Sequence, residues 1–297
     1  MTLCLAWGRN GEISLASDSR LTDPQGNVST DIATKIFTIG VKIFASNRRQ
    51  VLFNHSYGMC FAGSYVNGSI VADTMSELLS SLVFTDNGPV DADTIAQIAY
   101  GIYQDVCKHL MEINRHRGLS DIWLAGHCPQ TGRNRLFKFS WELNEQKDGI
   151  HFHYVEEDIG NQLLFLGDQV AIARAMELSQ QIKFERGIFT SGYTEYHLLQ
   201  NIIEDNKIPT VGGSMQTGHI LGNSFKQFGM VDYELWDIPN TNAKWVRDVA
   251  TFRGIPLARG IESVNAIRVD TSMICMAPFT EKKAALEQKA LALNQQK

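Results

Sequence analysis

The sequence lacks the features that mark membrane and secreted proteins. No apolar run approaches the roughly 18 residues that a membrane-spanning helix needs, and Met1 to Trp7 carry no basic leader of the kind found in secretory signals. The five cysteines are an odd number with wide spacings and no Cys-x-x-Cys pair, which argues against a disulfide framework and a zinc site. These absences predict a cytoplasmic protein without a membrane partner.

Signals for binding nucleic acids, nucleotides or metals are also missing. The 27 lysines and arginines are outnumbered by 32 aspartates and glutamates, for a net charge of -5, whereas phosphate backbones need a clustered basic surface. No Walker loop, Gly-x-Gly-x-x-Gly or Gly-x-Ser-x-Gly motif occurs. His151 and His153 lie on one face of an expected strand and could bind a metal, but no third ligand follows at a spacing typical of metal sites. We expect no nucleic acid, no metal and no cofactor.

The most informative segment is the N-terminus. The large apolar residues Leu3, Leu5 and Trp7 alternate with smaller ones, a turn spans Gly8 to Gly11, and Ile13 and Leu15 alternate again within 12–17. This is the pattern of a β-hairpin around an Asn-Gly turn. A chain that enters a core strand directly holds its first residues in place, so the pattern predicts that Thr2 is fixed.

Thr2 has the chemistry of a self-activating nucleophile. Its small side chain favours removal of Met1, and that removal leaves a hydroxyl and a free α-amine on one residue. A threonine hydroxyl is a poor nucleophile that needs a base. The α-amine, with an ordinary pKa of about 7.7 to 8.0, can be that base when it is neutral.

Three segments after the hairpin extend this pattern. They are Asp18 to Thr22, Lys35, and Phe61 to Ser64 at the end of a third apolar run. Together with Thr2 they resemble the proteasome β-subunit pattern of the N-terminal-nucleophile (Ntn) hydrolases, including the bacterial HslV and Anbu types. The resemblance covers the first part of the chain well and the rest loosely.

The resemblance implies a role for each matching residue. Thr2 is the nucleophile, Asp18 orients Lys35, and Gly63 supplies an N–H to the oxyanion, a donor typically worth about 2.7 to 4 kcal/mol. The charge of Lys35 would lower the pKa of the Thr2 amine by like-charge repulsion.

Two departures from the family pattern concern the groups that hydrogen-bond the threonine amine. Val211 stands where the family's Ser-Gly-Gly-Ser stretch has its first serine, and Gly167-Asp168 stands where a Gly-Ser precedes a helix. Either Asp168 or Asp205 substitutes for the missing serines, or the site is impaired. Asp168 is equally suited to cap a helix N-terminus. The candidate supporting residues are Ser19, Asp168, Asp205 and Ser214.

The order of the expected elements predicts an α+β fold. Periodicity predicts strands over 35–39, 41–45, 50–53, 57–64, 122–128, 135–143, 151–155 and 163–166, and helices over 65–84, 170–182 and 194–206. A further long helix opens with a capping box of Thr94 and Gln97. In the family this order forms a four-layer αββα sandwich, which we expect for residues 1–236.

Residues 237–297 are expected to form a C-terminal extension. An expected strand over 231–236 leads into it. Within it we expect strands over 261–269 and 273–276 and a helix or strand over 245–252. It ends in a helix from Glu281 to Gln296 that is capped by Thr280. The apolar seam of this helix is narrow, which favours a loose tail over docking on a neighbouring subunit.

These residues together predict a threonine-type endopeptidase of a bacterial proteasome-like, self-compartmentalised ring, with Thr2 exposed by removal of Met1. The resemblance implies a ring-shaped homo-oligomer that acts on peptides or unfolded proteins, and any nucleotide dependence would come from an ATP-dependent unfoldase partner. Two alternatives stay open. One is a structural ring subunit impaired by the changes at Val211 and Asp168, and the other is an Ntn amidase acting on a small molecule.

Overall fold

The computed structural model describes residues 2–295 except 24, 86–89, 115–117, 145–148, 161, 187–193, 206, 240, 242, 253–254 and 257–274. Within these residues, eight strands form a first sheet. Its spatial order is β11 (Leu163–Gly167), β1 (Leu3–Arg9), β2 (Glu12–Ser17), β12 (Gln216–Leu221), β13 (Ser224–Asp237), β14 (Lys244–Phe252) and β15 (Ile255–Pro256), with β16 (Cys275–Met276) beside β13.

A second sheet has six strands in the described part of the chain. Its order is β10 (Ile150–Glu157), β9 (Arg133–Leu143), β8 (Ser120–Cys128), β6 (Val51–Gly63), β5 (Ile36–Phe44) and β7 (Leu82–Val83). A small ribbon pairs β3 (Leu21–Thr22) with β4 (Val28–Thr30). The helices are α1 (Tyr65–Leu79), α2 (Ala92–Asn114), α3 (Gln169–Arg186), α4 (Thr194–Ile203) and α6 (Thr280–Gln295).

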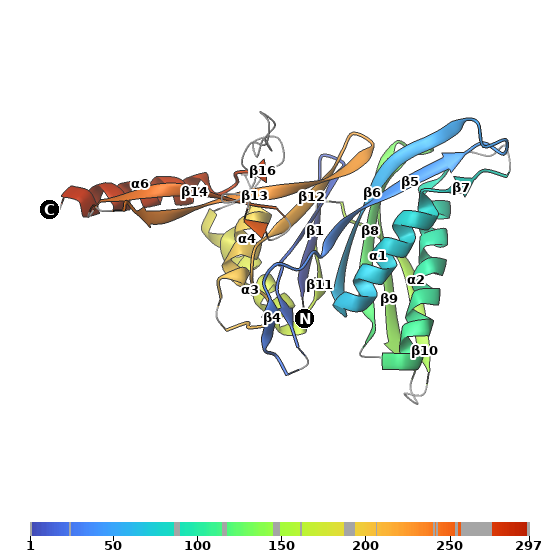
Figure 1. Cartoon of the computed structure of the whole chain (residues 1–297), viewed down its shortest axis with the longest axis horizontal. Helices are drawn as coiled ribbons and strands as arrows, with labels where there is room; N and C mark the ends of the chain where they lie inside the picture. Colours follow the sequence, from blue (N-terminus) through green and yellow to red (C-terminus); the bar gives the residue numbers. More distant parts are fainter. Residues whose placement is uncertain are drawn as a thin grey trace.

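The chain has a mixed α+β architecture in which helices cover the outer faces of both large sheets (Figure 1). Helices α1 and α2 pack on the second sheet, and α3 and α4 pack on β11 and β2 of the first sheet. Apolar side chains from both sheets meet in a cluster between them, including Cys4, Leu15, Trp123 and Phe225. This arrangement confirms the predicted α+β class.

Strand β1 is buried on both faces because helices cover one face of the first sheet here and the second sheet covers the other. Leu3, Leu5 and Trp7 belong to the cluster beneath α3 and α4, whereas Cys4 and Ala6 face the second sheet. Successive side chains of a strand point to opposite faces, so this alternation follows from the period of two. The predicted β1–β2 hairpin is confirmed, with Leu5 opposite Ala16.

The second sheet is more continuous than the periodicity predicted. The expected strands 35–39 and 41–45 are one strand, β5, and 50–53 and 57–64 are likewise one strand, β6. The residues between the two expected strands, Asn54 to Ser56, continue the ladder opposite β5. Ser56 also donates from its hydroxyl to the Phe225 carbonyl of the first sheet, which satisfies a polar group within a strand.

Several helix boundaries differ from the sequence prediction, most clearly the end of α1 and the start of α2. Helix α1 ends at Leu79, and Leu82–Val83 instead pair with β5 as the short parallel strand β7. Helix α2 already begins at Ala92, so the expected capping box of Thr94 and Gln97 is wrong, and the Gln97 amide donates to the Asp93 carboxylate at 2.6 Å. Local propensity marks a helix better than it marks its first and last residues.

The C-terminal part contains the largest correction. Helix α6 is not a loose tail, because it packs along β13 and β14 of its own chain (Figure 1). Ala290 is only 6% exposed. Lys282 forms an ion pair with Asp232, and the Asn294 side chain bonds the Lys244 backbone at both its N–H and its carbonyl. The partner of the narrow apolar seam lies far away in the sequence, where periodicity cannot detect it.

Other expectations in this region have mixed outcomes. Segment 245–252 is a strand, part of β14. Strand β12 was not expected, and it fills the position between β2 and β13. The expected strand 261–269 lies outside the described residues, as do 273 and 274, whereas Cys275–Met276 form β16 beside β13.

His219 on β12 connects the first sheet to α4. Its Nδ1 lies 2.7 Å from the Ser14 hydroxyl of β2, and its Nε2 lies 2.7 Å from the Tyr196 hydroxyl of α4. A neutral imidazole has one donor and one acceptor, which matches two hydroxyl partners. Desolvation by the surrounding residues lowers the pKa of His219 to about 4. The folded protein therefore keeps this ring uncharged.

This burial makes stability depend on pH in a defined window. The unfolded chain protonates His219 below its ordinary pKa of about 6.5, while the folded chain resists protonation down to about 4. We expect the free energy of unfolding to fall by about 3 kcal/mol from this group as the pH drops from about 6.5 to about 4. Urea unfolding across that range should show a shallower pH dependence for His219→Gln.

The exposed histidine of α2 provides the control for this measurement. His109→Gln should keep the wild-type pH dependence, because its ring is exposed and contacts only the Asp105 carbonyl of its own helix among the described hydrogen bonds. Parallel curves for wild type and His219→Gln would show that this buried ring does not control acid stability.

Candidate active site

A fully buried ion pair lies behind the N-terminal strand. The Lys35 ammonium is 2.9 Å from both carboxylate oxygens of Asp18, and both side chains are 0% exposed. Removing two charges from water is costly, and only close contact with further hydrogen bonds compensates for it. The pairing that the resemblance implied is therefore present in the structure.

Further donors surround the Asp18 carboxylate. Its Oδ1 accepts the Leu3 N–H at 3.1 Å, and its Oδ2 accepts the N–H groups of Arg20 at 3.1 Å and Gly212 at 3.2 Å. A carboxylate with two oxygens can accept about four hydrogen bonds. Asp18 thus links Lys35 to the peptide group that joins Thr2 and Leu3.

The backbone around Lys35 is held by Gln216 of β12. The Gln216 side-chain oxygen accepts the N–H groups of Lys35 at 2.9 Å and Ile36 at 3.3 Å. Its amide nitrogen donates to the Ala33 carbonyl at 2.5 Å. Gln216 was not among the predicted site residues, because one glutamine in a polar segment gives no sequence signal.

Thr2 is only 2% exposed and lies at the edge of a cavity of about 220 Å³. Its carbonyl accepts the Asp168 N–H at 2.9 Å. Opposite the start of β1, Gly167 has a φ of +131°, and a Cβ at this position would come within 1.9 Å of the Thr2 carbonyl oxygen. Only glycine lets the two backbones come this close.

Gly63 lines the same cavity from the end of β6. Its φ is +124°, and a Cβ there would lie 2.6 Å from the Leu119 carbonyl oxygen and 2.8 Å from the Ser120 Cα. The next residue, Ser64, caps α1 by accepting the Asn67 N–H at 3.4 Å. Strand and helix therefore fix the backbone of Gly63 beside Thr2.

Ser19 and Ser214 meet in the loop behind the site. The Ser19 hydroxyl accepts the Ser214 N–H at 2.7 Å and donates to the Asp31 carbonyl. Arg20 binds the Asp31 carboxylate at 2.6 Å, and this hydrogen bond holds the pKa of Asp31 below its ordinary value. These contacts give both serines a role in positioning the loop that carries Gly212.

Asp168 reaches the cavity of Thr2 while also capping α3. Its Oδ1 accepts the Val170 N–H at 2.8 Å, and its Oδ2 accepts the Thr210 hydroxyl at 2.6 Å. Val211, the other departure from the family pattern, is buried in the apolar cluster beneath α3 and α4. The N-cap alternative for Asp168 is thus observed, together with its place beside Thr2.

Asp205 is not brought to the site. Its carboxylate accepts the Lys207 N–H at 3.0 Å and the Arg174 guanidinium at 3.4 Å in the turn after α4. The Lys207 N–H and then the Arg174 contact lower the pKa of Asp205. Among the described residues that line the cavity of Thr2, Asp205 does not occur.

Asp121 and Trp141 also line the cavity and were missed by the sequence analysis. Burial raises the pKa of Asp121. The sequence signal for Asp121 is an acidic residue at the start of an otherwise apolar strand. This signal was overlooked because the expected strand began one residue later, at 122. Trp141, on β9, gives no distinguishing signal in the sequence.

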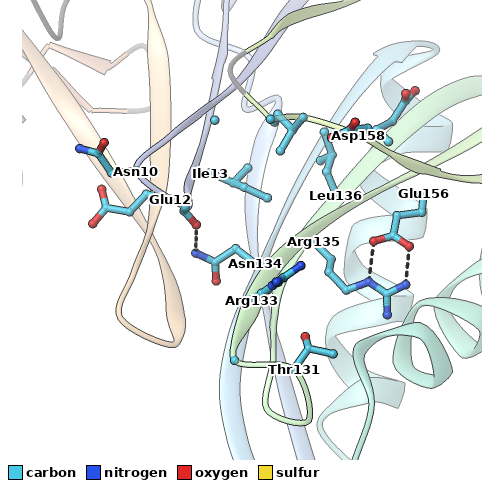
Figure 2. A pocket seen from close by; sticks show the side chains of 16 residues that line it. Asn10, Glu12, Ile13, Thr131, Arg133, Asn134, Arg135, Leu136, Glu156 and Asp158 are labelled. Atoms are coloured by element: carbon cyan, nitrogen blue, oxygen red, sulfur yellow. Dashed lines mark hydrogen bonds and ion pairs between the residues drawn. The ribbon is translucent and has the colours of Figure 1, made fainter.

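A larger cavity of about 1,340 Å³ lies where the β1–β2 turn, the β8–β9 turn and the end of β10 come together (Figure 2). Its polar groups largely satisfy one another. Arg135 pairs with Glu156, and the Asn134 amide donates to the Gly11 carbonyl at 2.8 Å. Thr2 and its neighbours do not line it, so the candidate chemistry belongs to the smaller cavity.

The described residues contain no group of three or more metal-ligating side chains placed to hold an ion. In the same part of the chain, no helix has the length and apolarity that a bilayer crossing requires.

The buried ion pair should be measurable as a coupling. Asp18→Asn or Lys35→Met alone leaves one buried charge unpaired, and we expect each to cost about 3 to 5 kcal/mol of unfolding free energy. The double variant removes both charges and should cost much less than the sum. Chemical denaturation of the four proteins completes the double-mutant cycle.

The exposed pair of Lys244 and Asp237 is the matched control. Its cycle should give a coupling below about 1 kcal/mol, because water screens exposed charges. A coupling this small at Asp18 and Lys35 would contradict the buried-pair interpretation.

Comparison with known proteins gives structural likenesses only. No protein-family model matches the chain, and no curated protein matches it. Among solved structures, it is similar to Anbu (ancestral beta-subunit) from Yersinia bercovieri, with 12% identity, a TM-score of 0.49, and coverage of 76% of this chain and 86% of that chain. It is also similar to the Anbu complex from Pseudomonas aeruginosa, described as a helical assembly, with 13% identity, a TM-score of 0.48 and the same coverage of each chain.

Proposed function

We propose that this chain is an N-terminal threonine peptidase in which Thr2, exposed by removal of Met1, is the nucleophile. The observation that carries the proposal is the position of Asp18. Its carboxylate binds the buried Lys35 ammonium and, at 3.1 Å, the N–H of Leu3, the residue directly after Thr2. The resemblance assigned catalytic roles to Thr2, Asp18 and Lys35.

The chemistry follows from the groups around the cavity. The neutral Thr2 amine accepts the proton as the hydroxyl oxygen attacks a peptide carbonyl, and the charge of Lys35 behind it favours the neutral amine. Gly63 N–H stabilises the negative oxygen of the tetrahedral intermediate. The amine then gives the proton to the leaving group, and water hydrolyses the resulting ester.

Asp168 and Ser19 have supporting parts in this proposal. Asp168 fixes the Thr2 carbonyl through its backbone N–H, at 2.9 Å. Its Oδ1 accepts the N–H groups of Val170 at 2.8 Å and Ala171 at 3.4 Å. Its Oδ2 accepts the Thr210 hydroxyl at 2.6 Å and has capacity for one more hydrogen bond, which we assign to the Thr2 amine. Ser19 and Ser214 hold the loop whose Gly212 N–H contacts Asp18.

The wider setting of the enzyme also remains a proposal. We assign residues 1–236 to an Ntn hydrolase domain whose helices and sheets form the four-layer αββα sandwich, and 237–297 to an extension. We propose a cytoplasmic ring-shaped homo-oligomer that takes peptides or unfolded proteins, with an ATP-dependent unfoldase as a candidate partner.

One observation favours a second function, a structural ring subunit with an impaired site. Val211 is buried among apolar side chains and offers no hydroxyl, while the carboxylate of Asp168 is occupied by the α3 cap and Thr210. Such a subunit would keep the buried pair of Asp18 and Lys35 for its stability alone.

Intact mass spectrometry distinguishes the two functions. With a β-lactone or a peptide epoxyketone, we expect the wild-type protein to lack Met1 and to carry a single adduct, because the inhibitor captures the Thr2 nucleophile. Thr2→Ala should form no adduct. Thr131→Ala, an exposed threonine at the larger cavity, should react like wild type.

A retained Met1 would contradict the proposal, since the Thr2 nitrogen is then an amide and cannot act as a base. A processed protein that never reacts would favour the structural subunit. A protein that reacts but hydrolyses small amides and no peptides would favour the amidase alternative.

A further inference from the structure

The cavity beside Thr2 has an acidic and aromatic lining. Besides Thr2 and Gly63, its walls include Leu119, Asp121, Trp141 and Asp168. No lysine or arginine is among the described lining residues. A group bound here would therefore meet two carboxylates and one large aromatic ring.

The two carboxylates differ in what they already bind. Asp168 is engaged by the α3 backbone and Thr210. Oδ1 of Asp121, in contrast, is buried and has no hydrogen-bond partner among the described residues. A buried acceptor without a partner is costly, and native proteins rarely keep one without a reason.

The fold places Asp121 beside the reacting groups. Asp121 on β8 pairs with Ala62 on β6, the residue immediately before Gly63. The same strand register that fixes Gly63 at the cavity thus fixes Asp121 next to it. A side chain bound against Asp121 lies next to the position where Gly63 would hold the oxyanion.

Two groups from the neighbouring strand β9 partly compensate Asp121. The charge of Lys138 and the backbone N–H of Trp141 both lower its pKa, yet burial is the larger effect and the net shift is upward. Lys138 forms no ion pair with Asp121 among the described residues. The carboxylate therefore retains an unmet demand for a cation or a donor.

The size of the cavity limits what can fill it. About 220 Å³ is smaller than the roughly 300 to 1,000 Å³ of pockets that enclose a whole drug-sized ligand, and it is sufficient for one long side chain. Trp141 supplies an aromatic face, and cations bind favourably to such faces. Lysine and arginine combine an apolar stem with a cationic head, which matches this lining.

We propose that Asp121 and Trp141 form a specificity pocket for a basic residue, the lysine or arginine whose carbonyl Thr2 attacks. This inference rests on the proposed function of Thr2 and adds a substrate class to it. The ammonium or guanidinium donates to the Asp121 carboxylate, while the stem of the side chain packs against Trp141 and Leu119.

The test compares two fluorogenic peptides that differ only in the residue before the scissile bond, arginine or leucine. We expect wild type to show a higher kcat/KM for the arginine peptide. Asp121→Asn should lower the ratio of the two kcat/KM values by at least about tenfold, since a hydrogen bond to a buried charged group carries about that much discrimination. Asp105→Asn, an exposed acid on α2, should keep the wild-type ratio.

A binding measurement separates this proposal from the proposed function. We expect p-aminobenzamidine, a cation that needs no catalysis, to bind wild type at least about tenfold more tightly than Asp121→Asn, and its neutral amide analogue to show no such difference. If the inhibitor forms no adduct on Thr2, the proposed peptidase function is overturned. Adduct formation with an unchanged ratio and unchanged binding in Asp121→Asn would overturn the specificity pocket alone.

Stability gives a further check on Asp121. If its charge serves the substrate and not the fold, Asp121→Asn should unfold at the same or a higher temperature than wild type, because an uncompensated buried charge is removed. A clear fall in the unfolding temperature, with the cleavage ratio unchanged, would show that the carboxylate is a structural group.

Discussion

The buried pair of Asp18 and Lys35 is the interaction on which the site depends. Both side chains are fully excluded from water, so each charge is stabilised there by the other. The pair also ties together segments far apart in the sequence, because Asp18 binds Leu3 near the N-terminus and Gly212 in the loop before β12. Any movement of the N-terminal strand would break contacts to a buried carboxylate, and this cost keeps Thr2 in place.

The sheet provides the second constraint on Thr2. Strand β1 lies between β11 and β2, and both of its faces are packed. Because Leu3 pairs with Gly167, the backbone of β11 passes against the Thr2 carbonyl, and Gly167 is the residue that allows this approach. The first residue of the strand is thus held by a ladder on one side and by the Asp18 carboxylate on the other. A side chain held this way loses little further freedom when a ligand binds beside it.

The parts of this arrangement that the sequence predicted are those with a short-range or chemical signature. The β1–β2 hairpin follows from alternation around Asn10 and Gly11, and the resemblance pointed to the contact of Asp18 with Lys35 and to Gly63 beside Thr2. Gln216, the close contact of Gly167 with Thr2 and the docking of α6 could not be predicted, because each depends on a partner distant in the sequence. Asp205 shows the opposite error, since it was a plausible acid by type but its loop pairs it with Arg174.

Asp18 and Asp121 show how one fold uses the same side chain in two ways. Asp18 has a cation and three backbone N–H donors within hydrogen-bond distance, so its burial is compensated inside the protein. Asp121 has a buried oxygen without a hydrogen-bond partner among the described residues, and burial raises its pKa more than Lys138 and the Trp141 N–H lower it. A carboxylate that the protein itself does not neutralise is a liability for stability, and such liabilities persist where a ligand compensates them. Asp18 therefore holds the site together, whereas Asp121 is the group that we expect to bind the substrate side chain.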